Sequence, residues 1–226
     1  MYEERPAAPA LADRVVCEWS SVREAGGTQL VVPDACVDLV WGPAGPFVAG
    51  PDTGPVPTVM RPGDTFTGVR FRPGAVGEVF GVPLDWLRDQ RVPLASLDVM
   101  RELTEGEPDD RAAAMRGAVA RRLRETAPAD PATSALVAAL RRGRTVREAA
   151  ADLGYGERQL HRRSVAGFGY PPKTLQRILR FQRALRLART GVPFAEVAAL
   201  TGYTDQAHLS HDVRRLSGVP LRSLTR

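Results

Sequence analysis

Two groups of polar side chains in the C-terminal part of the chain are of the types that hydrogen-bond to the edges of DNA bases. Arginine suits guanine and glutamine suits adenine, whereas histidine and serine make more adaptable contacts. The first group is Arg158, Gln159, His161 and Arg162, and the second is Gln206, His208, Ser210 and His211. Such side chains read a sequence only when a helix carries them into the major groove, so the surrounding elements must supply two such helices.

The two groups lie in the two copies of an internal repeat. Residues 148–155 and 196–203 align at an offset of 48, and each copy has a glutamate, an alanine-rich run and a Gly-Tyr pair. After one extra residue the match continues, with 169–175 over 218–224. A repeat of this length indicates one supersecondary unit that is used twice.

Each copy has the pattern of a helix, a short turn and a second helix. In the first copy the alanine-rich helix ends at Gly154, because glycine takes the left-handed conformation of a helix C-terminus without strain. The next helix begins near Glu157. In the second copy the turn contains Gly202 and the next helix begins near Asp205. This layout is typical of a helix-turn-helix, and two copies joined by a helical connector are a far stronger signal than one.

The segment 173–189 predicts the connecting helix. It would span ~25 Å and, with the offsets of the two units, could set the second helices one DNA turn apart, ~34 Å. Its arginines recur every three residues, at Arg177, Arg180, Arg183, Arg186 and Arg189, and its expected core residues are Leu175, Ile178, Leu179, Leu185 and Ala188. We expect Arg163, Lys173 and Arg214 to contact the DNA backbone, which positions a protein without specifying sequence.

The run Gly-Tyr-Thr-Asp-Gln-Ala-His-Leu-Ser at 202–210 and the Gly-Val-Pro at 218–220 carry a specific signature. They are similar to the DNA-binding domain of the AraC/XylS family of bacterial transcription regulators. The resemblance covers about residues 131–226. It implies an all-helical domain whose two helix-turn-helix units read successive major grooves of double-stranded DNA.

Three positions depart from that family. An aromatic residue is frequent where Ser164 and Leu209 stand, and serine is common where Gly156 begins the first reading helix. A serine or glycine at these positions of the first unit predicts a reading helix that is less well buried and less well capped than usual.

Charge divides the chain into two halves. Residues 131–226 hold 17 Arg or Lys against 6 Asp or Glu, a net of +11, whereas residues 1–130 hold 14 against 20, a net of −6. A basic half joined to an acidic half is expected when only one half meets nucleic acid. The chain lacks a long apolar stretch, a signal peptide and a disulfide framework, so we expect a cytoplasmic protein that does not enter a membrane.

The N-terminal half has the pattern of short strands separated by Gly and Pro turns. The runs are 15–19, 29–32, 37–41, 46–49 and 65–72. Alternation places Val37, Leu39 and Trp41 on one face and Asp38 and Val40 on the other. These features predict a small antiparallel β barrel or sandwich with one apolar and one more polar face.

Helical segments follow the strands. Residues 75–80 and 83–87 read as two short helices packed on the sheet, and 109–126 as an amphipathic helix that is either a plain linker or a dimer contact. Asp130 before Pro131 predicts an N-cap followed by proline at the first helical position, which opens the next helix.

We therefore expect an α+β protein of two domains. The limits are 1–107 for a β-rich sensing or dimerisation domain, 108–130 for the connecting helix and linker, and 131–226 for the DNA-binding domain with two helix-turn-helix units. Residues 32–39 and 68–75 resemble the N-terminal domain of a subset of AraC-like regulators over about residues 8–100. That resemblance does not identify a ligand.

The N-terminal domain has two candidate sensing roles. By family analogy it binds a small organic effector, with Trp19, Cys36, Asp38, Trp41 and Arg70 as candidate contacts. Alternatively it is a redox or metal sensor, if the strands that carry Cys17 and Cys36 are neighbours so that the thiols pair or share a soft metal. Buried structural cysteines are the commoner outcome.

An enzyme is the rival from another class. All three histidines lie in the basic half, so neither cysteine has a local histidine to activate its thiol. The sequence has no zinc-spaced cluster, no phosphate-binding glycine loop and no Gly-x-Ser-x-Gly elbow. We assign no catalytic residue, metal or cofactor. The prediction is a DNA-binding transcription regulator whose expected partners are double-stranded DNA, a small-molecule effector and a second copy of the chain, with RNA polymerase as a further candidate.

Overall fold

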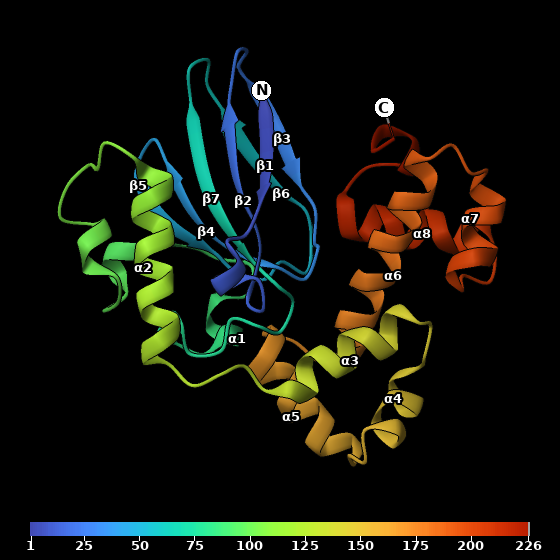
Figure 1. The fold of residues 1–226 in the computed structure, drawn as a ribbon. Coiled ribbons are helices and arrows are strands. Elements are labelled where there is room, and N and C mark those ends of the chain that lie inside the picture. Colours follow the sequence, from blue (N-terminus) through green and yellow to red (C-terminus); the bar gives the residue numbers. More distant parts are fainter. Residues whose placement is uncertain (226) are drawn as a thin grey trace.

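The structure, a computed structural model, describes residues 1–225 and has a β-rich N-terminal part followed by a helical C-terminal part (Figure 1). The strands are β1 Tyr2–Pro6, β2 Val15–Val22, β3 Gly27–Val31, β4 Val37–Gly42, β5 Gly45–Ala49, β6 Val56–Met60, β7 Thr65–Phe71 and β8 Arg91–Pro93. The helices are α1 Leu84–Leu87, α2 Arg111–Glu125, α3 Pro131–Arg141, α4 Val146–Asp152, α5 Glu157–Phe168, α6 Pro172–Arg189, α7 Phe194–Thr201 and α8 Gln206–Ser217. Within residues 1–225, no helix is both long enough and apolar enough to cross a lipid bilayer.

Two antiparallel sheets form the N-terminal part. Six strands pair in the order β1-β2-β7-β4-β5-β8, and β3 pairs with β6 in a separate two-stranded sheet. On β4 the side chains of Val37, Leu39 and Trp41 enter the N-terminal core, whereas Asp38 and Val40 face the other side of the sheet. The predicted alternation and the antiparallel β fold are therefore confirmed.

Three strands lie outside the sequence prediction. All five residues of β1 are exposed, so this edge strand shows no apolar alternation. β6 contains Pro57, and proline disfavours a strand because it has no N–H to donate to a neighbouring strand. β8 has only three residues. Each of them is a strand because a neighbour in the sheet supplies hydrogen bonds, which no local pattern reveals.

The helix expected at 75–80 is absent, and this prediction was wrong. The segment forms turns, because Gly74, Gly77 and Gly81 take positive φ angles of 76°, 57° and 70° that interrupt a right-handed helix. Its apolar side chains are still buried. The ring of Phe80 packs edge-on against the ring of Phe71, with 5.5 Å between the ring centroids. The sequence therefore predicts correctly that the apolar side chains of this segment are buried, but it does not predict the conformation of the backbone. The second short helix is confirmed as α1.

Helix α2 belongs to the N-terminal core. Met115, Ala118 and Val119 are buried among the residues of that core, and Arg116 forms two hydrogen bonds with the carboxylate of Glu18 on β2, at 2.8 and 2.7 Å. The apolar face of α2 is therefore covered by the β-rich N-terminal part of the chain (Figure 1).

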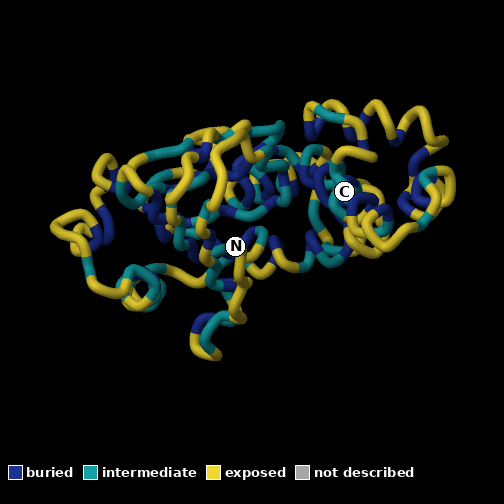
Figure 2. Tube along the Cα trace, turned by 90° about the horizontal axis from the view of Figure 1, so that it is seen from above, coloured by how far each residue is buried: buried dark blue, intermediate teal, exposed yellow. Residues whose placement is uncertain are grey.

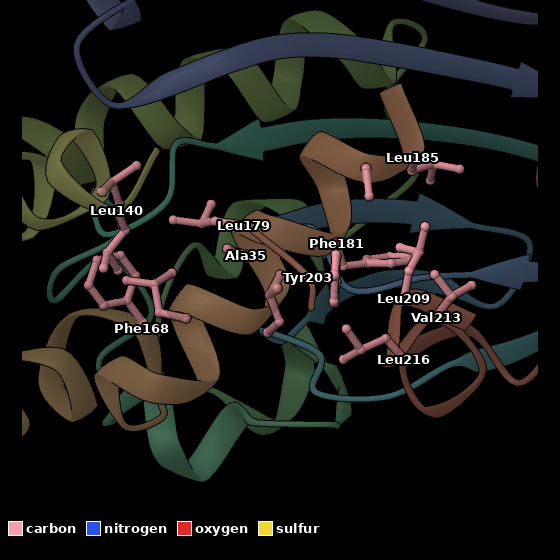
Figure 3. Close-up of a cluster of buried hydrophobic side chains, with 14 of the residues drawn as sticks. Ala35, Leu140, Phe168, Leu179, Phe181, Leu185, Tyr203, Leu209, Val213 and Leu216 are labelled. Atoms are coloured by element: carbon pink, nitrogen blue, oxygen red, sulfur yellow. The ribbon is translucent and has the colours of Figure 1, made fainter. Parts of the chain in front are cut away.

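The C-terminal helices follow the predicted pattern closely. The side chain of Asp130 accepts a hydrogen bond from the N–H of Ala132, and Pro131 is at the first helical position of α3. The five apolar residues expected to face the core on α6 are all buried there. Phe181 and Ala184 of α6 join the same cluster, together with side chains from α3, α7 and α8. Figure 3 shows Phe181 with Leu140 of α3 and Leu209 of α8 among the side chains of this cluster. The double helix-turn-helix architecture is thereby confirmed.

The two parts pack directly on each other, with buried residues in both (Figure 2). Ala35, in the loop before β4, lies among the C-terminal core residues (Figure 3). Gln182 of α6 donates a hydrogen bond to the Pro33 carbonyl at 2.6 Å. Gly169 lies so close to α1 that a Cβ there would be 2.6 Å from the Leu84 carbonyl oxygen.

Candidate nucleic-acid interface

The first helix-turn-helix consists of α4 and α5. Thr145 and Glu148 form a reciprocal capping box at the start of α4, and Gly154 takes a φ of 69° in the turn. Helix α5 then begins after Gly156, whose position supplies no side-chain cap, as the sequence predicts. Of the four reading candidates in this unit, Arg158, His161 and Arg162 are exposed and Gln159 is half-buried.

The expectation that α5 is poorly buried was wrong at Ser164. This side chain is fully buried, and its hydroxyl donates to the Tyr170 carbonyl at 2.8 Å. Leu160 and Phe168 are buried on the same side of the helix. A hydrogen-bonded serine therefore fills the position where the family often has an aromatic ring.

The second helix-turn-helix consists of α7 and α8. Gly202 ends α7 in the left-handed conformation, and the Asp205 carboxylate accepts the N–H of His208 at 2.7 Å, which caps α8. All four of its reading candidates, Gln206, His208, Ser210 and His211, are exposed, as is Arg214. The ring of His208 also packs edge-on against the ring of Tyr203, with 5.1 Å between the ring centroids, so a residue of the turn before α8 orients the His208 side chain.

Of the three residues expected to contact the DNA backbone, two are exposed and the third is held in an ion pair. Lys173 is exposed in the first turn of α6, and Arg214 is exposed on α8. Arg163 pairs with Asp130, and its guanidinium lies 4.7 Å over the ring of Tyr155. The charge of Arg163 is therefore already engaged in joining α5 to the start of α3.

A buried contact orients the second reading helix on the connector. Arg180 of α6 lies 3.2 Å from the Asp212 carboxylate, and the Tyr203 hydroxyl donates to the same oxygen at 2.9 Å. The Arg180 guanidinium also lies 4.1 Å over the Tyr203 ring. Burial, together with Asp212, raises the pKa of Tyr203, so its hydroxyl stays protonated and donates.

A cavity of about 620 Å³ lies between the two sheets and is closed on one side by α6. Most of its lining is apolar and aromatic, including Trp19, Phe47 and Phe66, and α6 contributes Gln182, Leu185 and Arg189. A largely apolar cavity with a few converging polar groups is typical of a site for a small organic ligand.

The polar wall of this cavity is a network around Asp38. Its carboxylate accepts from Trp19 Nε1 at 3.2 Å and from Arg70 Nε at 3.1 Å. Arg70 also lies 3.4 Å from Glu4 and 3.8 Å from Asp34, so three carboxylates share one guanidinium. Burial raises the pKa of Asp38 to about 6; Arg70 opposes that shift and Asp34 adds to it.

The structure brings together three of the five effector candidates. Trp19, Asp38 and Arg70 line the cavity, whereas Trp41 lies in the core on the opposite face of β4, with the Arg111 guanidinium 5.6 Å from its ring. Cys36 does not line the cavity; its N–H donates to the Asp34 carboxylate at 2.9 Å. Grouping Trp41 with Asp38 was wrong, and the alternation along β4 already placed these two residues on opposite faces. The lining residues missed from the sequence include Phe47 and Phe66 on the strands and the residues of α6, a helix that no local pattern links to the sheet.

The cysteines do not meet the condition on which the redox alternative depended. Strand β7 lies between β2, which carries Cys17, and β4, which begins just after Cys36, so the two strands are not neighbours. Burial raises the pKa of the Cys17 thiol to about 11 and also raises the pKa of the Cys36 thiol, which disfavours the reactive thiolate. Within residues 1–225, no three His, Cys, Asp or Glu side chains are grouped so as to hold a metal ion.

Comparisons with known proteins agree with these two parts. A family described as a helix-turn-helix domain, of AraC type, matches residues 149–226, and a domain of unknown function (DUF6597) matches residues 3–93. No curated protein sequence matches the chain.

Among solved structures, the chain is similar in fold to ToxT from Vibrio cholerae. An apo variant of ToxT aligns with a TM-score of 0.50 and 10% identity, covering 97% of this chain and 98% of that one. A further ToxT structure, from a P21 crystal form, aligns with a TM-score of 0.50 and 9% identity, covering 99% of this chain and 97% of that one. At such identities the likeness shows the two-domain fold alone. Residues 149–226 therefore belong to the AraC-type helix-turn-helix family, whose members are DNA-binding transcription regulators.

Proposed function

We propose that this regulator reads DNA with α5 and α8 in successive major grooves, and that a small organic effector in the cavity between the sheets modulates that binding. One observation carries the proposal: α6 joins the two reading units and also forms a wall of the cavity, through Gln182, Leu185 and Arg189. A ligand in the cavity would therefore touch the helix that sets the spacing of the reading helices.

The base contacts come from the exposed side chains of the two reading helices and from the half-buried Gln159. We assign this role to Arg158, Gln159, His161, Arg162, Gln206, His208, Ser210 and His211, with Lys173 and Arg214 on the backbone. We leave Arg163 out of the contact set, because its partner is Asp130.

The effector is an organic molecule with an apolar body and at least one polar group. The aromatic and aliphatic lining suits the body, and the network of Asp38 and Arg70 offers both a hydrogen-bond acceptor and a donor to the polar group. We place the domain limits at 1–107, 108–130 and 131–226, with α2 packed on the first. We propose a homodimer and contact with RNA polymerase on the family resemblance alone, and because the apolar face of α2 is covered, we do not assign the dimer contact to it.

A footprint on the DNA that flanks the gene for this chain tests the DNA-reading proposal. The wild type should protect a site, and Arg162→Ala and His211→Ala should each weaken or redistribute that protection, since each removes one reading side chain. Arg124→Ala, an exposed arginine on α2, is the matched control and should leave the footprint unchanged. Unchanged protection in both reading variants would show that α5 and α8 are not the reading helices.

A further inference from the structure

A second hollow in the helical part is lined by arginines. Its volume is about 530 Å³, and it lies between the segment from α3 to α4, the middle of α6 and the end of α7. Arg141, Arg144, Arg180, Arg183 and Arg186 line it. No reading helix contributes to its walls, so it is distinct from the base-reading surface.

Among the residues that the structure describes, three of these arginines have no acidic partner. Arg144 pairs with Glu148 and Asp152, and Arg180 pairs with Asp212. Within residues 1–225, no carboxylate lies within 4.0 Å of the guanidinium of Arg141, Arg183 or Arg186, and all three side chains are exposed. A concave surface with a surplus of guanidinium groups is complementary to phosphate, because the planar donors of arginine match phosphate oxygens.

The place of the hollow in the fold indicates which phosphates it would take. One wall is the segment that enters α4 of the first unit, and the opposite wall is the end of α7 of the second, with α6 between them (Figure 1). If α5 and α8 occupy successive major grooves, the backbone of the duplex crosses between those grooves opposite the middle of the connector. Arg183 lies just past the middle of α6, and Arg186 lies three residues further on, in its last turn.

We propose that the hollow formed by Arg141, Arg183 and Arg186 with the neighbouring arginines holds phosphate groups of the DNA backbone that crosses between the two major grooves. This rests on the proposed function and adds a contact surface to it. The same helix then has two faces in use: Gln182, Leu185 and Arg189 border the effector cavity, and Arg183 and Arg186 border the phosphate hollow.

The test measures binding of the full chain to a labelled duplex of mixed sequence, over a series of salt concentrations. Each phosphate contact contributes about 0.9 to the slope of log affinity against log salt. The double variant Arg183→Ala/Arg186→Ala should lower the slope by about 1.8 and weaken binding to all sequences alike. Arg183→Lys/Arg186→Lys should retain most of the slope, because lysine keeps the charge.

The matched control is Arg61→Ala/Arg124→Ala, which removes the same charge from two exposed arginines of the N-terminal half. Equal slopes in the hollow variant and this control would overturn the phosphate hollow while DNA binding itself stands. A wild type without salt-dependent DNA binding would overturn the proposed function as well. The last measurement is the binding of inorganic triphosphate to the wild type and to Arg183→Ala/Arg186→Ala at constant ionic strength. If it binds in a way that needs Arg183 and Arg186 while the DNA slope does not, the hollow is a small-anion site and the proposal is wrong.

Discussion

Arg180 and Asp212 join the connector helix to the second reading helix, with Nη2 of Arg180 3.2 Å from Oδ2 of Asp212. The Asp212 side chain is only 8% exposed, and it also accepts the Tyr203 hydroxyl at 2.9 Å. The orientation of α8 relative to α6 therefore depends on the Asp212 carboxylate, which Arg180 and Tyr203 hold in place.

Replacing Asp212 with asparagine should destabilise the chain by about 2 kcal/mol, because Arg180 loses its partner in a mostly buried site. The measurement is urea unfolding. Asp152→Asn is the control, since Asp152 pairs with Arg144 at the surface and should change stability little. A loss no larger than that of the control would mean that the contact does not hold α8 on α6.

Gly169→Ala should cost more than Gly154→Ala. Both glycines have positive φ angles, 77° and 69°, so either alanine pays about 1 kcal/mol of backbone strain. At Gly169 the new Cβ would also lie 2.6 Å from the Leu84 carbonyl oxygen, whereas at Gly154 it meets nothing within 4 Å. We expect a total loss of about 3 kcal/mol at Gly169 in thermal unfolding. Equal losses would contradict the close approach of α5 and α1.

Asp38 should make stability depend on pH. Burial raises the pKa of Asp38 in the folded chain from 3.8 to about 6, so the folded state holds a proton that the unfolded state has lost between these values. The contribution of Asp38 is therefore most favourable below pH 4 and falls as pH rises to 6, by about 2–3 kcal/mol.

The check is the difference in unfolding free energy between the wild type and Asp38→Asn, measured from pH 4 to pH 7. As pH rises across this range, the wild type should become less stable relative to Asp38→Asn, because asparagine does not titrate. Asp98→Asn, whose side chain in the wild type is 80% exposed, controls for removal of a carboxylate. A constant difference would show that Asp38 does not titrate here.

Arg162→Ala and Lys173→Ala should weaken DNA binding in different ways. Removing Arg162, a proposed base contact, should lower affinity for a footprinted site by about 1–3 kcal/mol and relax its sequence preference. Removing Lys173 should weaken all duplexes alike and reduce the salt slope by about 1. Competition between a specific and a mixed-sequence duplex separates the two effects, and the reverse pattern would exchange the two assigned roles.

The sequence by itself determined the double helix-turn-helix, its caps and its connector. These features are local: the helix period, Gly154 and Gly202 at the helix ends, and the cap by Asp130 involve residues only a few positions apart, so their pattern survives without a structure. The alternation on β4 is local in the same way, which is why it placed Trp41 and Asp38 on opposite faces correctly.

Tertiary structure decided what depends on partners far away in the chain. The hydrogen bond from Gln182 to Pro33 joins residues 149 positions apart, and Ala35 lies in a core built by helices from the other half. The cavity wall on α6, the engaged charge of Arg163 and the buried Ser164 arise from such contacts. They could not be predicted because a periodic pattern specifies which face of an element is apolar, whereas packing alone selects the element that covers that face.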